Sequence, residues 1–215
     1  MFLGKLIKDI KPAYKSIKFN NIRFNSKDCK RNDIFFSIQG TKSNGNNYIK
    51  NAIKNGSKII ISNLNFEGFD KEKILFIKSK NPRKTLAEAA SNFYTKKPKN
   101  IIALTGTNGK TSIVNFFYQI LSLSKKKVAA IGTLGVLSKK IKLKTNNTTI
   151  DPIRMHQILQ KLKKLKIDNV IIEASSHGLK QHRLDKINFK TALFTNLSRD
   201  HLDYHKTFKD YLNSK

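Results

Sequence analysis

The sequence has little cysteine, few acidic residues and no long apolar run, and each shortage excludes a class of protein. Its 215 residues include a single cysteine, Cys29, which excludes an internal disulfide and any cysteine-based metal cluster. No apolar run approaches the roughly 18 residues of a membrane span. Lys5, Lys8 and Asp9 interrupt the N-terminal segment, so it lacks the apolar centre of a signal peptide. We therefore expect a cytoplasmic protein with no membrane partner.

The shortage of acidic residues leaves the chain strongly basic. There are 43 Lys and Arg residues against 14 Asp and Glu, a formal net charge of +29, which raises the hypothesis of a non-catalytic nucleic-acid-binding protein. The lysines are nevertheless spread along the whole chain, and the longest basic run is the three residues 125–127. We favour a solvated lysine surface, which would also attract an anionic substrate, and expect no nucleic-acid partner.

The first part of the chain predicts a small domain of strands and helices. A length of 215 residues allows one large domain or two modest ones, each with its own core, and a hydrophobic content of 39% indicates a folded protein. Apolar runs predict strands at 34–38 and 58–62. A helix is expected at 48–55, ended by Gly56, and another from Asn81-Pro82 through residue 94. The join to the next domain is placed in the segment 94–98.

The second part alternates strand and helix more regularly. The sequence predicts strands at 101–104, 128–131, 170–172 and 192–194, and helices at 110–124 and 151–165. This alternation indicates a parallel sheet covered by helices on both faces. Ligands of such sheets bind beyond the carboxyl ends of the strands, and the motifs below all follow strands.

The segment TGTNGKT after the strand at 101–104 predicts a phosphate-binding loop. Gly106 and Gly109 allow backbone N–H groups to converge on phosphate oxygens at a helix N-terminus. Lys110 can reach the terminal phosphates, and the hydroxyl of Thr111 can bind Mg²⁺. Leu104 stands where the common pattern G-x-x-x-x-G-K-[ST] has Gly, so the loop is a variant of that pattern. We expect an ATP site here.

Three strings in this part resemble the MurE type of Mur ligase, an ATP-dependent amide ligase of cell-wall synthesis. They are TGTNGKT, the string EASSHGL at 173–179 followed by Gln181 and Arg183, and TNLSRDHLDYH at 195–205. The resemblance runs over nearly the whole chain. It implies an α/β fold with a UDP-sugar-binding domain at 1–97 and a parallel-sheet, P-loop-type ATP-binding domain at 98–215. It also implies that this domain is truncated and that the C-terminal amino-acid-binding domain of the family is absent.

The resemblance implies roles for the residues of these strings. Lys110, His201 and Lys215 would be catalytic, with Lys215 carbamylated. Mg²⁺ would be held by Thr111, Glu173, His201 and the carbamate. ATP would contact the loop residues Gly106, Thr107, Asn108, Gly109, Lys110, Thr111 and Ser112.

The resemblance also implies the contacts of a sugar nucleotide. The uracil would lie near Phe24 and Ser26, although Asn25-Ser26-Lys27 stands where the family usually shows D-S-R. The further substrate contacts would be Thr41, Lys42, Ser43, Asn147, Thr148, Thr149, Ser175, Gln181 and Arg183.

The implied reaction joins a third amino acid to UDP-N-acetylmuramoyl-L-Ala-D-Glu. The D-Glu carboxylate attacks the γ-phosphate of ATP, and the acyl phosphate is then attacked by the amine of meso-diaminopimelate or L-lysine. We expect a monomer with poor activity on its own. Three alternatives stay open: another Mur ligase or a folylpolyglutamate synthase, a non-catalytic fragment that binds the nucleotide sugar, and the nucleic-acid-binding protein.

Overall fold

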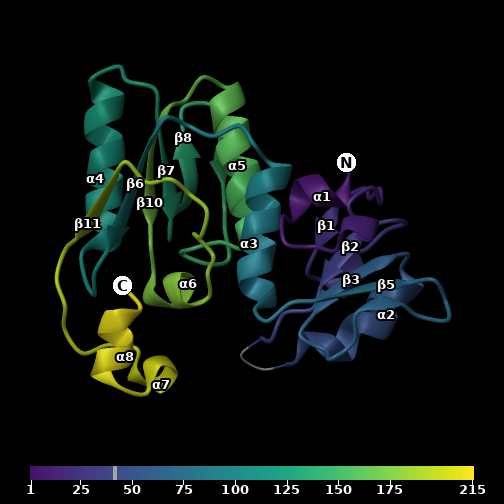
Figure 1. Cartoon of the computed structure of the whole chain (residues 1–215). Helices are drawn as coiled ribbons and strands as arrows, with labels where there is room; N and C mark the ends of the chain where they lie inside the picture. Colours follow the sequence, from purple (N-terminus) through teal and green to yellow (C-terminus); the bar gives the residue numbers. More distant parts are fainter. Residues whose placement is uncertain (41–42) are drawn as a thin grey trace. The chain divides into compact units, whose positions relative to one another are not determined.

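The computed structural model describes residues 1–40 and 43–215, so Thr41 and Lys42, both expected to contact substrate, lie outside the described residues. The chain divides into two compact units, residues 1–93 and 94–215 (Figure 1). The division falls at the start of the segment 94–98 in which the sequence places the join. Within the described residues, no helix has both the length and the apolar character needed to cross a bilayer.

The first unit is built on a mixed sheet. Its strands lie in the order β1-β2-β3-β5-β4, all parallel except β4, which pairs antiparallel with β5. The strands are β1 (Ile22–Arg23), β2 (Ile34–Phe36), β3 (Ile59–Ser62), β4 (Gly68–Phe69) and β5 (Leu75–Lys78); the helices are α1 (Leu3–Leu6), α2 (Ile49–Lys54) and α3 (Pro82–Phe93); single turns of 3₁₀ helix are η1 (Pro12–Tyr14), η2 (Ser26–Asp28) and η3 (Gly45–Tyr48).

Alternate residues of these strands pack on opposite faces of the sheet. Phe35 and Ile60 pack against Ala52 of α2 in one hydrophobic cluster. On α3, Leu86 and its neighbouring alanines are fully buried, and the Asn92 side chain donates to the carbonyl of Leu6 at the end of α1. The predicted strands and helices of this unit are therefore confirmed, with ends that differ by a few residues.

The second unit holds the phosphate-loop motif. Its sheet has the order β11-β6-β10-β7-β8-β9, of which β11, β6, β10 and β7 are parallel. The strands are β6 (Asn100–Thr105), β7 (Val128–Gly132), β8 (Gly135–Ser138), β9 (Lys142–Leu143), β10 (Asn169–Glu173) and β11 (Thr191–Phe194); the helices are α4 (Lys110–Leu123), α5 (Pro152–Lys164), α6 (Ser176–Lys180), α7 (Leu202–His205) and α8 (Phe208–Asn213).

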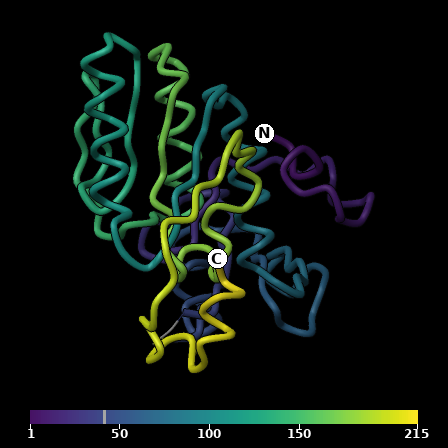
Figure 2. The backbone as a smooth tube through the Cα atoms, turned by 90° about the vertical axis from the view of Figure 1, so that its left-hand side faces the viewer, coloured from purple at the N-terminus to yellow at the C-terminus, as the bar shows by residue number. Residues whose placement is uncertain are grey.

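Helices cover both faces of this sheet, as the sequence predicts. Ile172 of β10 packs in one cluster with Met155 of α5, while the adjacent Ile171 packs in another with Val114 of α4. Figure 1 shows α4 and α5 on either side of the strands, and Figure 2 shows the C-terminal segment, drawn in yellow, continuing from β11 toward α7 and α8. The carboxyl ends of β6, β7 and β10 meet at one edge, where the candidate site is built.

One part of this sheet differs from the parallel sheet that the sequence predicts. After β7 the chain turns back through Thr133 and Leu134 into β8, which pairs antiparallel with β7, and β9 then pairs with β8. The short segment 142–143 and the mixed polarity of 135–138 carry no strong strand pattern. The tight turn sets Thr133 at the carboxyl edge of the sheet.

Candidate functional site

The predicted phosphate loop connects β6 to α4 and is held by the segment that follows β11. Gly106 has φ +142°, and a Cβ there would clash with the Thr195 hydroxyl, so only glycine fits. Asn196 accepts from the Asn108 N–H at 2.9 Å and donates to its carbonyl at 3.2 Å. Thr195 also donates to the Asn108 carbonyl, at 2.9 Å. The loop therefore has a fixed shape at the N-terminus of a long helix, which favours an anion.

Lys110 opens α4 and carries the positive charge of the loop. Its ammonium donates to the carbonyls of Gly106 and Thr107 at 2.8 and 2.7 Å. Burial lowers the pKa of Lys110, and the nearby charge of Lys215 lowers it further. A phosphate at this position would restore a favourable environment for the ammonium, because an anion offsets both effects.

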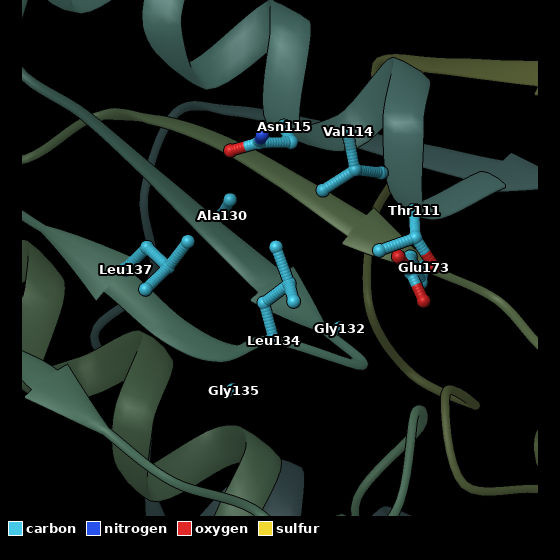
Figure 3. A pocket seen from close by; sticks show the side chains of 9 residues that line it. All are labelled: Thr111, Val114, Asn115, Ala130, Gly132, Leu134, Gly135, Leu137 and Glu173. Carbon is cyan, nitrogen blue, oxygen red and sulfur yellow. The ribbon is translucent and has the colours of Figure 1, made fainter.

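Glu173 ends β10 beside β6, as expected for a carboxylate opposite the loop. Its side chain is 1% exposed. One carboxylate oxygen, Oε2, accepts from the N–H and the hydroxyl of Thr133 at 3.1 and 2.7 Å. The other, Oε1, is buried and has no hydrogen-bond partner among the residues that the structure describes. Figure 3 shows Glu173 and Thr111 of α4 next to each other at one end of a small pocket that both line.

An unpaired buried carboxylate oxygen beside a hydroxyl fits a hard cation. Burying such an oxygen without a partner is costly, and Mg²⁺ prefers one or two carboxylates, a hydroxyl and phosphate oxygens as ligands. Thr111 and Glu173 supply the two protein groups of that set. Among the residues that the structure describes, no three His, Cys, Asp or Glu side chains gather into a metal-binding group, so the protein alone forms only part of a metal site.

His201, expected as a second metal ligand, lies in a cluster of rings after β11. It takes a left-handed conformation with φ 51° and packs edge-on against His177 at a centroid distance of 4.8 Å. Its Nε2 lies 3.4 Å from an oxygen of Asp200. Tyr204 stacks on the other imidazole, His177, at 4.1 Å. Because the His201 side chain is 46% exposed, its ring remains accessible to a ligand.

Lys215 and the phosphate loop both contact Tyr211 of α8. The Tyr211 hydroxyl is hydrogen-bonded to the Thr107 hydroxyl at 2.9 Å, and Thr107 also accepts from the Ser198 N–H at 3.0 Å. The Lys215 ammonium lies 4.4 Å from the centre of the Tyr211 ring. Burial lowers the pKa of Lys215 to about 8. The structure thus brings Lys215 near Lys110, and the Tyr211 ring lies 6.5 Å from that of His201.

The expected substrate residues 147–149 form a loop beside Glu173. Asn147 is exposed and Thr148 is half-buried, while Thr149 is 1% exposed. The Thr149 hydroxyl donates to the Glu173 carbonyl at 2.8 Å and accepts from the Ser175 N–H at 2.9 Å. Its hydrogen is therefore committed inside the protein, and Thr149 and Ser175 shape the loop from which Asn147 and Thr148 face solvent.

Arg183 and Gln181 join this loop to the cluster of rings. Arg183 donates to the Thr149 carbonyl at 2.5 Å, and its Nε and Nη2 donate to the Gln181 amide oxygen at 3.1 and 2.7 Å. The Gln181 amide nitrogen donates to the Tyr204 hydroxyl at 3.1 Å. The guanidinium is thus fixed in direction by two neighbours, which suits it to an anionic group.

In the first unit, three expected substrate residues border one hollow. Phe24, Ser26 and Ser43 line a depression of about 500 Å³, together with Tyr48 and Asn51. The rings of Phe24 and Tyr48 are 41% and 46% exposed, so both are open to a ligand in this hollow. Exposed rings beside amide and hydroxyl groups can stack on a base and hydrogen-bond its edge.

Sequence reasoning missed several residues that the structure places in these regions. Thr133, Tyr204 and Tyr211 stand in no pattern that assigns them a partner, and a lone Thr in a turn is by default a turn former. The hydrogen bonds of Tyr204 and Tyr211 join residues 23 and 104 positions apart, a pairing that spacing cannot show. Tyr48 ends η3 and Asn51 lies on α2, and the position of both beside Phe24 depends on the fold.

Both parts of the chain match models of known protein families. Residues 18–94 match the model described as Mur ligase family, catalytic domain, and residues 104–215 match the Mur ligase middle domain. The chain belongs to the Mur ligase family. A UDP-N-acetylmuramoyl-L-alanyl-D-glutamate–2,6-diaminopimelate ligase of Clostridium tetani is 40% identical over 99% of this chain and 44% of the relative. The ligase of the same name from Wigglesworthia glossinidia brevipalpis is 41% identical over 93% and 42% of the two chains.

Solved Mur ligases share the fold. A solved structure of a UDP-N-acetylmuramoyl-L-alanyl-D-glutamate–2,6-diaminopimelate ligase superposes with a TM-score of 0.81 and 26% identity over 100% of this chain and 44% of that one. A MurF ligase from Thermotoga maritima, solved in complex with ADP, gives a TM-score of 0.59 at 20% identity over 91% and 42%. This Mur ligase chain therefore spans less than half the length of each of these four relatives.

Proposed function

We propose that this chain carries the ATP-binding and UDP-sugar-binding parts of a ligase that adds 2,6-diaminopimelate to UDP-N-acetylmuramoyl-L-Ala-D-Glu. The observation that carries the proposal is the pair formed by the phosphate loop and Glu173. A rigid glycine loop at a helix N-terminus stands opposite a carboxylate with one buried, unpaired oxygen. The names of the relatives supply the substrate and the acceptor, and favour diaminopimelate over L-lysine.

The residues of the loop bind and orient the nucleotide. The N–H groups at the start of α4 and the Lys110 ammonium hold the phosphates, and Thr111 with Glu173 holds Mg²⁺, which neutralises phosphate charge when it is bound. Lys110 then stabilises the charge that develops as the substrate carboxylate displaces ADP from the γ-phosphate and forms an acyl phosphate. Positioning and charge neutralisation supply the rate enhancement, and the chain needs no covalent intermediate of its own.

The substrate contacts follow from the exposed groups of the two units. Phe24 and Tyr48 flank the base, and Ser26, Ser43 and Asn51 offer polar partners to the nucleoside. Asn147 and Thr148 offer amide and hydroxyl groups to the peptide end, and Arg183 attracts an anionic group. Thr149, Ser175 and Gln181 hold these groups in place through the hydrogen bonds described above.

Lys215 is proposed to act as a carbamate. Its amine, with a pKa of about 8, is partly neutral at pH 7 to 8 and can attack dissolved CO₂. The neutral amine forms a C–N bond to the carbon of CO₂ and releases one proton, so the side chain becomes a carbamate anion; starting from the ammonium form, two protons are released in all. That change removes the repulsion between Lys215 and Lys110 and provides a charge that, with His201, suits a second Mg²⁺.

The carbamate predicts a signal in carbon-13 NMR. Protein equilibrated with ¹³C-bicarbonate at pH 8 should show a carbamate resonance, and Lys215→Arg should abolish it. Lys209→Arg on the exposed side of α8 is the matched control and should retain the resonance. A spectrum that is the same for wild type and Lys215→Arg contradicts the modification.

The proposed function is tested by calorimetric titration with UDP-N-acetylmuramoyl-L-Ala-D-Glu, and separately with ADP and Mg²⁺. We expect saturable binding of both. Asn147→Ala should weaken sugar-nucleotide binding about tenfold, roughly the effect of one lost hydrogen bond to a charged or well-ordered group. Lys110→Ala should weaken ADP binding without affecting the sugar nucleotide.

Arg154→Ala, on the exposed side of α5, is the control and should leave both affinities unchanged. A folded wild-type chain that binds ADP but no muramoyl nucleotide would favour a different ligase of the superfamily. A panel with dihydrofolate, UDP-N-acetylmuramoyl-L-Ala and the tripeptide product would then identify the substrate class. Binding of neither ligand contradicts the proposal.

A further inference from the structure

We propose that Thr133 is a positioning residue that fixes the carboxylate of Glu173 for the metal and links it to the substrate loop through Thr148. The inference rests on the proposed function, because it concerns the metal expected at Thr111 and Glu173. Neither the sequence motifs nor the family resemblance assigns any role to Thr133.

The contacts of Thr133 fix one oxygen of the carboxylate and leave the other free. Its N–H and its hydroxyl both donate to Oε2 of Glu173, at 3.1 and 2.7 Å. Two donors from one residue hold Oε2 in a single direction, so the carboxylate cannot rotate without breaking both bonds. Oε1, which is buried without a partner, is consequently held at the pocket that Thr111 also lines.

Gly132, the last residue of β7, lies directly against the Glu173 carboxylate. A Cβ at this position would come 2.6 Å from Cδ of Glu173 and 2.9 Å from Oε1. No side chain fits there, because these distances are shorter than real carbon contacts. The backbone of Gly132 therefore packs directly against the Glu173 carboxylate, and Thr133 supplies its two hydrogen-bond donors. Since β7 pairs in parallel with β10, this turn reaches the same edge of the sheet as Glu173.

A hydrogen bond between Thr133 and Thr148 connects the Glu173 carboxylate to the proposed substrate loop. The hydroxyls of Thr133 and Thr148 lie 2.9 Å apart. A hydroxyl has one hydrogen, and a carboxylate oxygen only accepts, so the Thr133 hydrogen is committed to Glu173. Thr148 must then donate to Thr133. This direction leaves Thr148 with only lone pairs for another partner, so the group it contacts on the substrate is a donor such as a peptide N–H.

The inference predicts how metal affinity responds to the Thr133 hydroxyl. The probe is Mn²⁺ in place of Mg²⁺, measured by electron paramagnetic resonance in the presence of ADP, with ADP affinity in EDTA and the melting temperature as separate readouts. Thr133→Val keeps the shape and the N–H but removes the hydroxyl donor. We expect it to weaken Mn²⁺ binding about tenfold, the lower end of the usual effect of groups that orient a metal ligand. Metal-free ADP affinity should stay unchanged.

Three further variants complete the test. Thr133→Ser restores the donor and should return Mn²⁺ affinity to within about twofold to threefold of wild type. Thr145→Val is the control. The Thr145 hydroxyl lies near Thr148 in the segment after β9, but it donates to the backbone carbonyls of Gly132 and Asn147 and not to Glu173. This variant should bind Mn²⁺ as wild type does. Thr148→Val breaks only the link and should weaken Mn²⁺ binding by a few-fold, which keeps the inference testable if Thr133→Val does not fold.

Two outcomes separate this inference from the proposed function. If wild type binds ADP and Mn²⁺, and Thr133→Val and Thr148→Val bind Mn²⁺ equally well, the positioning role is wrong and the proposed function stands. If wild type binds ADP but takes up no Mn²⁺, the metal role of Glu173 and the inference both fail. Weakening that Thr133→Ser does not rescue also overturns the inference, because it shows a need for volume and not for the donor.

Discussion

His156 is the fully buried histidine of α5, and its burial has a consequence for stability. Burial, together with the nearby charge of Lys97, lowers its pKa from 6.5 to about 4. As the pH falls, His156 therefore binds a proton near pH 6.5 in the unfolded chain but only near pH 4 in the folded chain. Because the unfolded state binds more protons in this window, stability falls as the pH falls from 6.5 toward 4.

Replacing His156 should remove this acid-sensitive contribution. Between pH 7.5 and pH 5, wild type should lose about 2 kcal/mol more of its free energy of unfolding than His156→Leu, given roughly 1.4 kcal/mol per pH unit below the unfolded pKa. Urea unfolding of both proteins at the two pH values measures the difference. Met155, the buried neighbour of His156 on α5, has no titratable group and offers the matched variant Met155→Leu, which should keep the pH dependence of wild type. Equal losses in wild type and His156→Leu contradict the expectation.

Also at the residue scale, the motif positions could be predicted but their partners could not. The order of strand, loop and helix predicts Lys110 and Thr111 at one site, and the family resemblance adds Glu173. The structure brings Thr111 and Glu173 together. Thr133 carries no pattern, since its importance arises from a hydrogen bond to a residue 40 positions away. The exposure of Phe24 also depends on packing, which a local sequence does not determine.

At the scale of elements, the phosphate loop shows how one glycine holds two segments together. Gly106 and Gly68 have nearly the same positive φ, 142° and 138°, but a Cβ at Gly68 would meet nothing within 4 Å. Gly106→Ala adds a clash with Thr195 to the backbone strain, whereas Gly68→Ala adds strain alone.

We expect Gly68→Ala to cost about 1 to 3 kcal/mol, the usual cost of this region of φ for a residue with a Cβ. Gly106→Ala should cost more and should abolish ADP binding, because the loop must move away from the Thr195 segment. Denaturant unfolding and ADP titration of both variants test this pair. A Gly106→Ala protein with the stability of Gly68→Ala and normal ADP affinity would show that the loop adapts without loss.

The elements themselves followed the apolar pattern closely where it was strong. The predicted strands at 101–104 and 128–131 and the helix at 151–165 correspond to β6, β7 and α5. The hairpin β7–β8 was missed because its two-residue turn, Thr133-Leu134, lacks the Asn-Gly or Asp-Gly signal of such turns. Two-residue strands such as β4 exist only through their partner, so local pattern cannot predict them.

At the scale of the whole molecule, the net charge of +29 makes weak association with any polyanion unavoidable. Duplex DNA should bind at 50 mM salt and lose most of its affinity by 200 mM, as sequence-independent phosphate contacts do. Binding of the muramoyl nucleotide, which also uses stacking and hydrogen bonds, should fall much less over the same range. Fluorescence anisotropy with labelled DNA and calorimetry with the nucleotide measure the two dependences.

Because the lysines are spread, no small cluster should dominate DNA binding. Replacing Lys125, Lys126 and Lys127 by Gln should lower DNA affinity only in proportion to the three charges removed and should leave nucleotide binding intact. Tight DNA binding that survives 200 mM salt and disappears in this triple variant would restore the nucleic-acid-binding hypothesis.

The long-range hydrogen bonds that hold the phosphate loop determine when it can form during folding. The loop obtains its shape from Asn196, Ser198 and Tyr211, residues 88 to 104 positions further along the chain. Closing chain loops of that length is slow compared with forming α4 or the β7–β8 hairpin. A ribosome-bound chain that has not yet released α8 therefore has the sheet strands and helix of a nucleotide site but not its rigid loop. Nucleotide capture should begin only after α8 has left the ribosome, and the loop should be among the last native contacts of this unit to form during refolding.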